Sequence, residues 1–299
     1  KLTQQRKIQA YLAEMEDYVI ASWVCCVVAV VGFAVYSVVF TALERRRKAR
    51  EEGELKLTAE DFVTARNTAN LSQIAWSFYA TSVGAWVIVT PGNYATFAGV
   101  IGMVMYAIAV GIPTIAIAFL GLRLQQLFPK CSSLAEFCGS RFGPFTQLLV
   151  VSLTLFNMAI VIIAEYTTIG ALFKDFVGTI EWPFVALVAV LTLGYTAYGG
   201  LHISIITDRV QAIFSVLLVL VLCIYAAVAF RFDTSRPLPE DLGPNFYGYS
   251  AIFTMPVSLM GASIFSEALW QRVWASADDR VLRRGAMISC AMLVVVVLV

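Results

Sequence analysis

The chain is 299 residues long, with 60% apolar residues, 14% charged residues and a formal net charge of +1. Soluble domains carry about 25% charged residues, so this chain is too apolar to cover itself with a polar surface. The near-neutral charge excludes the strong positive field of a typical nucleic-acid binder, and a lipid bilayer is the expected surrounding.

Long apolar runs follow one another along the whole chain. A helix of about 20 apolar residues crosses a bilayer. Runs of this kind cover residues 17–42, 73–92, 97–122, 146–173, 183–199, 205–230, 249–270 and 286–299. The sequence therefore predicts an all-α, multi-pass membrane protein. We also expect this chain to be a fragment of a longer protein, cut inside its eighth membrane helix. The first run is too long for a cleaved signal peptide and predicts a retained, extra N-terminal helix.

Basic residues predict which loops face the cytoplasm. Fifteen Lys and Arg residues fall in one set of alternating loops, 43–70, 123–145, 200–209 and 271–285. Three fall in the other set, 93–96, 174–182 and 231–248. By the positive-inside rule the first set is cytoplasmic, and the N-terminal tail 1–16 is extracellular in the cell membrane. The basic cytoplasmic loop 43–70 begins as a solvated linker or a helix extension, and the Pro-rich loop 231–248 is extracellular.

Two of the apolar runs are irregular. Residues 80–85 are small and polar at the expected centre of a span, which indicates either close helix packing or a helix broken at Gly84. In the run 249–270, Pro256 removes a backbone hydrogen bond and Gly261 follows, which predicts a second break. Two broken helices five positions apart are typical of inverted-repeat transporters. The prediction is a first repeat over 71–230 and the start of a second over 249–299.

Several ionisable residues lie in or near these runs. Glu267 either reaches cytoplasmic water or faces a cavity, and Glu165 either has a function or pairs with a neighbour. Asp208 follows the Gly199-Gly200 pair that ends a helix, where it either favours the next helix N-terminus or acts in function. His202 is expected to be a loop residue rather than a proton relay. No nucleophile elbow, metal pair or phosphate loop occurs, so neither an enzyme nor a bound cofactor is expected.

Four segments in order resemble the sodium:solute symporter family, over about residues 17–299. They are EDFVTARNT at 60–68, ATSVGAWVIVTPG at 80–92, Gly199-Gly200-Leu201 with Thr207-Asp208 and Gln211, and WQRVWAS at 270–276. The resemblance implies a leucine-transporter-type inverted-repeat helix bundle, of which this chain holds the N-terminal part, and uptake coupled to Na⁺ or H⁺.

The resemblance also implies site residues. The backbone carbonyls of Ala80 and Val83 would bind the transported cation, and Asp208 would line its release path. Some family members carry an acid where Ser82 stands, so a carboxylate is not expected to assist at that position. The implied substrate contacts are Ser82, Gly84, Trp86, Ser263, Ser266 and Glu267.

The predicted function is a cation-coupled symporter, with sodium as the first choice, that imports a small polar solute by alternating access. The Trp270-Gln271-Arg272 ending weakly resembles the urea transporters of the family. The alternative is a sensor or receptor in which a symporter-like membrane part is joined to a C-terminal signalling region. The expected partners are the solute, the cation and the bilayer, with no nucleic acid.

Overall fold

The computed structural model describes residues 2–52, 64–129, 131–229 and 240–298. Its helices are α1 (Leu2–Glu52), α3 (Leu71–Ser82), α4 (Trp86–Leu127), α5 (Leu134–Phe142), α6 (Pro144–Val177), α7 (Trp182–Ala229), the 3₁₀ helix η1 (Glu240–Leu242), α8 (Phe246–Ile264), α9 (Glu267–Ala275) and α10 (Asp279–Leu298). Residues 53–63 and 230–239, which hold parts of the predicted loops 43–70 and 231–248, lie outside the described residues.

The described helices fit a multi-pass membrane protein. Six helical stretches are long and apolar enough to cross a membrane, or seven if α8 and α9 form one bent span. The prediction of an all-helical membrane protein is therefore confirmed. The segment 1–16, predicted as a tail before the first membrane helix, is instead part of α1, which is helical from Leu2 onward. The same helix continues past residue 43 to Glu52. Its ends are rich in Gln, Glu, Lys, Arg and Ala, which are good helix formers, so the helix extends beyond the apolar stretch.

Two glycines turn the chain without a loop. Gly99 inside α4 has a φ of 65°, and Gly200 inside α7 has a φ of 67°. Side-chain-bearing residues rarely adopt this left-handed conformation, and glycine does so without steric cost. Gly200 ends one helix as predicted, but the predicted loop 200–209 is wrong. The next helix begins at once, so Asp208 lies in its second turn.

The chain divides into two compact units. Unit 1 holds residues 1–56 and 163–200, and unit 2 holds 57–162 and 201–299. In unit 1, the Trp23 ring of α1 packs edge-on against Phe173, with 4.7 Å between ring centroids. The Trp23 indole N–H donates to Thr179 Oγ1 at 3.1 Å. These contacts fasten the extra helix to the α6–α7 junction.

A pocket of about 870 Å³ lies at the same junction in unit 1. Trp23, Lys174 and Glu181 are among the side chains that line it. None of the predicted site residues does so, and all of those residues belong to unit 2.

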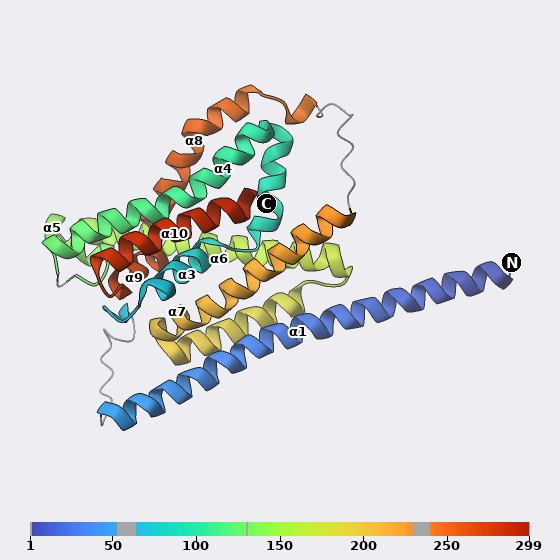
Figure 1. Ribbon diagram of the computed structural model, residues 1–299, viewed down its shortest axis with the longest axis horizontal. Coiled ribbons are helices and arrows are strands. Elements are labelled where there is room, and N and C mark those ends of the chain that lie inside the picture. Colours follow the sequence, from blue (N-terminus) through green and yellow to red (C-terminus); the bar gives the residue numbers. More distant parts are fainter. Residues whose placement is uncertain (1, 53–63, 130, 230–239, 299) are drawn as a thin grey trace. The chain divides into compact units, whose positions relative to one another are not determined.

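The core of unit 2 is formed by residues of α3, α4, α7, α9 and α10. The helix α4 lies along α8 and α10, α10 lies along α3, and α9 contacts both α3 and α4 (Figure 1). The buried side chains of this core include Ile74, Phe78, Ile117, Leu269, Trp270, Val273 and Leu282. Burial against neighbouring helices therefore sets the positions of α3 and α9, which both carry predicted site residues.

A glycine makes the contact between α3 and α10 close. A Cβ added at Gly285 would lie 2.7 Å from Ile74 Cγ2. We expect Gly285→Ala to lower the thermal denaturation midpoint in detergent, because overpacking a tight contact costs about 1–3 kcal/mol. Gly92→Ala in α4 is the control, since no heavy atom lies within 4 Å of its added Cβ. Equal midpoints for the two variants would contradict the tight contact.

Candidate functional site

The helical run predicted over residues 73–92 is interrupted around Gly84. The helix α3 ends at Ser82, Val83 is extended with φ −97° and ψ 131°, and α4 begins at Trp86. The Val83 N–H donates to the carbonyl of Tyr79 at 3.0 Å. No backbone N–H of the described residues donates to the carbonyls of Ala80 or Val83. The structure therefore favours the broken helix over an unbroken, close-packed one, and it leaves these two carbonyls open.

A second break separates α8 from α9, which are bent by 69°. It lies at Phe265 and Ser266, whereas α8 runs through Pro256 and Gly261 without interruption. The prediction of a break at Pro256 and Gly261 is therefore wrong.

Side chains explain the position of the second break. The indole N–H of Trp270 donates to the carbonyl of Ile264 at 2.8 Å. The amide nitrogen of Asn157 donates to the carbonyl of Phe265 at 3.4 Å. These donors replace backbone N–H groups that a continuous helix would supply, so the carbonyls stay paired where the helix stops.

The helices on either side of the two breaks contact one another. The helix α9 contacts both α3 and α4, and α8 lies along α4. Trp86, at the start of α4, packs edge-on against Tyr106 with 5.7 Å between ring centroids. The same cluster includes Met255 and Leu259 of α8. Trp86, at the first break, thus shares a cluster with residues of α8, the helix that ends at the second break.

The structure places the predicted substrate contacts at these breaks. Ser82, Gly84 and Trp86 lie at the first break, and Ser263, Ser266 and Glu267 lie at the second. Ser266 stands at the N-cap position of α9, and its hydroxyl makes no capping hydrogen bond. The binding of one solute by these residues stays a prediction.

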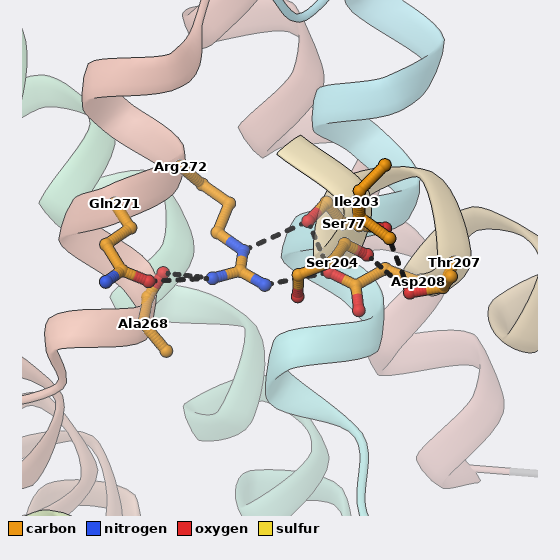
Figure 2. Close-up of polar contacts among 8 residues, drawn as sticks. All are labelled: Ser77, Ile203, Ser204, Thr207, Asp208, Ala268, Gln271 and Arg272. Atoms are coloured by element: carbon orange, nitrogen blue, oxygen red, sulfur yellow. Dashed lines mark hydrogen bonds and ion pairs between the residues drawn. The ribbon is translucent and has the colours of Figure 1, made fainter. Parts of the chain in front are cut away.

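A buried polar cluster joins three helices of unit 2. It consists of Ser77 of α3, Asp208 of α7 and Arg272 of α9 (Figure 2). Arg272 Nη2 lies 2.8 Å from Asp208 Oδ2, and these side chains are 6% and 16% exposed. The Ser77 hydroxyl donates to the same oxygen at 2.7 Å, and Arg272 Nε donates to the Ser77 Oγ at 3.0 Å. Charge-assisted bonds in a buried setting are strong, so the cluster ties α3, α7 and α9 together.

Sequence reasoning singled out Asp208 but missed its partner. Arg272 also donates from Nη1 to the carbonyl of Ala268 at 3.0 Å, which fixes its direction along α9 (Figure 2). The available signal was an Arg directly after an apolar run, because such a charge needs a counter-ion when it is buried. The structure supplies that counter-ion from a helix 64 positions away in sequence.

Arg66, in the segment before α3, bonds to the connection between α4 and α5 and lies over a ring near the end of α9. Its guanidinium donates to the carbonyls of Pro129 at 2.6 Å and Cys131 at 2.9 Å. It also lies 5.8 Å from the centroid of the Trp274 ring. The Ala69 N–H donates to the carbonyl of Ala275 at 2.9 Å. The start of α3 and the end of α9 are therefore held together at this side of unit 2.

Glu136 lies on α5, outside the membrane-spanning helices. Its Oε2 accepts hydrogen bonds at 2.7 Å from both the backbone N–H and the hydroxyl of Ser132. These bonds hold the pKa of Glu136 below its ordinary value, and the positive charge of Arg66 lowers it further. The carboxylate therefore stays ionised beside the Arg66 contacts.

Other ionisable residues lie elsewhere. Glu165 belongs to the part of α6 in unit 1. His202 stands on a helix rather than in the predicted loop, and its side chain is not among those described. In the described part of the chain, no group of three or more His, Cys, Asp and Glu residues is arranged to hold a metal ion.

Comparison with known proteins connects this arrangement to transporters. No protein-family model matches the chain. The chain is 28% identical over 232 residues to a spermidine transporter of Candida albicans, covering 77% of this chain and 44% of that protein. It is 25% identical over 167 residues to the urea active transporter of Saccharomyces cerevisiae, covering 55% of this chain and 22% of that protein. The chain thus spans less than half the length of each of these relatives.

The fold matches a solved symporter. The structure resembles that of a Na⁺-coupled sialic acid symporter in a substrate-bound, outward-open state, with a TM-score of 0.65 and 16% identity. The match covers 91% of this chain and 58% of that one. The predicted leucine-transporter-type helix bundle is confirmed. The chain is a multi-pass membrane protein whose relatives are transporters rather than enzymes.

Proposed function

We propose that the chain forms part of a cation-coupled symporter that imports a small polar solute across the cell membrane by alternating access. The observation that carries this proposal is the first helix break, where the carbonyls of Ala80 and Val83 have no backbone donor among the described residues. Open carbonyls of a broken membrane helix are suited to coordinate Na⁺. Sodium is the proposed cation, and the Na⁺-coupled symporter of similar fold supports that choice.

The energy for uptake would come from the cation. One elementary charge that crosses a potential of 100 mV releases about 2.3 kcal/mol. In this proposal the N-terminus is extracellular, and the Ser77–Asp208–Arg272 cluster lies on the cytoplasmic side of the breaks. A cation that leaves the first break would then pass Asp208.

Binding of the cation at the same cluster would change the contacts between α3, α7 and α9. Ser77 and Arg272 both bind Asp208 Oδ2, and they belong to α3 and α9. A cation that approaches Asp208 weakens the hold of Asp208 on Arg272, because both positive groups compete for one carboxylate. The halves α3 and α9 could then separate from α7 and open the cytoplasmic side.

The proposed solute site lies between the two breaks. Its walls would be the six substrate contacts predicted from the sequence, Ser82, Gly84, Trp86, Ser263, Ser266 and Glu267. Spermidine and urea, the solutes named for the two relatives, are the first candidates.

The test is uptake by the full-length protein in proteoliposomes. Labelled spermidine and urea are supplied separately, with an inward sodium gradient or an inward proton gradient. We expect concentrative uptake under the sodium gradient and its loss when an ionophore collapses that gradient. Uptake under the proton gradient alone would show that the coupling ion is H⁺ instead of Na⁺. Binding of a solute without uptake under either gradient would favour the receptor alternative.

A further inference from the structure

Glu267 places an acid at the second break without a protein counter-ion. It is the first residue of α9 and is partly buried. Among the described residues, no hydrogen bond or ion pair reaches its carboxylate. The Arg of the same helix, Arg272, is bound to Asp208. An ionised acid within a membrane protein is costly unless a cation accompanies it, so this position is suited to a positively charged ligand.

The backbone around Glu267 does not suit a bare metal cation. The carbonyls of Ile264 and Phe265 accept side-chain donors, and the carbonyl of Ser263 accepts the N–H of Ser266 at 3.0 Å. The carbonyl of Ser266 accepts the N–H of Leu269 at 3.1 Å. Dehydrating an alkali cation requires a shell of available oxygens, which these carbonyls do not offer.

The two breaks therefore differ in chemistry. At the first break, the carbonyls of Ala80 and Val83 are open and no acid stands among residues 80–85. At the second, the carbonyls are occupied and a carboxylate is available. A carboxylate with little other oxygen around it suits a cation that brings its own N–H donors, and an ammonium group has three.

We propose that Glu267 binds an ammonium group of the transported solute, so that the solutes of this site are cationic amines. This inference rests on the proposed symporter function and names its substrate class. The carboxylate accepts charge-assisted hydrogen bonds from the ammonium group, and the coupling cation binds separately at the first break.

The experiment compares a charged and a neutral solute. Uptake of labelled spermidine and of labelled urea is measured as a function of solute concentration with the full-length protein in proteoliposomes. The variants are Glu267→Gln, Glu267→Asp and the control Glu181→Gln, which changes an acid in unit 1. For Glu267→Gln we expect the half-saturating concentration of spermidine to rise at least about tenfold, because a charged hydrogen bond is lost. The half-saturating concentration of urea should rise much less than that of spermidine, because urea carries no ammonium group, and Glu181→Gln should match the wild type for both solutes.

The possible outcomes distinguish a failure of the Glu267 inference from a failure of the proposed symporter function. An unchanged half-saturating concentration for spermidine in Glu267→Gln would overturn the inference, as would an equal loss for spermidine and urea. Wild-type uptake of urea but not of spermidine would overturn it as well and leave the symporter function in place. No uptake of either solute under any gradient would contradict the proposed symporter function itself.

A second comparison covers the case in which Glu267→Gln does not fold. Triacetylated spermidine, whose three amines are all neutral amides, is tested as a competitor of spermidine uptake by the wild type. We expect at least about tenfold weaker competition than by unlabelled spermidine. Equal competition would overturn the inference, because the ammonium groups would then be unnecessary.

Discussion

Replacing Arg272 with Met should lower the free energy of unfolding by about 3–5 kcal/mol, because it leaves Asp208 partly buried without its counter-ion. The pair is 2.8 Å apart, and the two side chains are 6% and 16% exposed. The Ser77 hydroxyl would remain as a donor to Asp208, but a neutral hydroxyl does not balance the charge. The measurement is denaturant-induced unfolding of the full-length protein in detergent micelles.

Two further variants test the reason for this loss. Removing both charges with Arg272→Met and Asp208→Asn together should recover part of the stability, since no uncompensated charge stays buried. Arg280→Met, at an exposed position near the start of α10, is the control and should change stability by less than about 0.5 kcal/mol. If the double variant is as unstable as Arg272→Met alone, the buried pair is not the cause.

Replacing Asp208 with Asn should reduce sodium-dependent uptake at least about tenfold, if the proposed symporter function holds. The carboxylate of Asp208 is the group that Ser77, Arg272 and a departing cation would share, and charged hydrogen bonds contribute about 1.5–3 kcal/mol each. The measurement is the initial rate of uptake as a function of sodium concentration, scaled to the amount of folded protein.

The control for this variant changes an exposed acid in the same way. Asp278 accepts the N–H of Val281 at 2.7 Å near the start of α10, and Asn can accept the same bond. Asp278→Asn should therefore leave uptake unchanged. An unchanged rate and an unchanged sodium dependence in Asp208→Asn would exclude Asp208 from the cation path.

The sequence by itself determined the features that depend on neighbouring residues. The length of an apolar run decides whether a helix can cross a bilayer, so the membrane class followed from composition and run length. Gly200 turns the chain because of its own backbone freedom, and the break at Gly84 arises within a short small-residue segment. These properties depend on residues close together in the chain, so the sequence pattern can predict them.

Only the tertiary structure decided the features that depend on distant residues. Arg272 meets Asp208 across 64 positions of sequence, and no spacing rule connects them. The second break lies at Phe265 and Ser266 instead of at Pro256, because Trp270 and Asn157 reach the carbonyls there. A proline marks where a helix can lose a hydrogen bond, but the donors that replace helical bonds come from side chains that only packing brings into place.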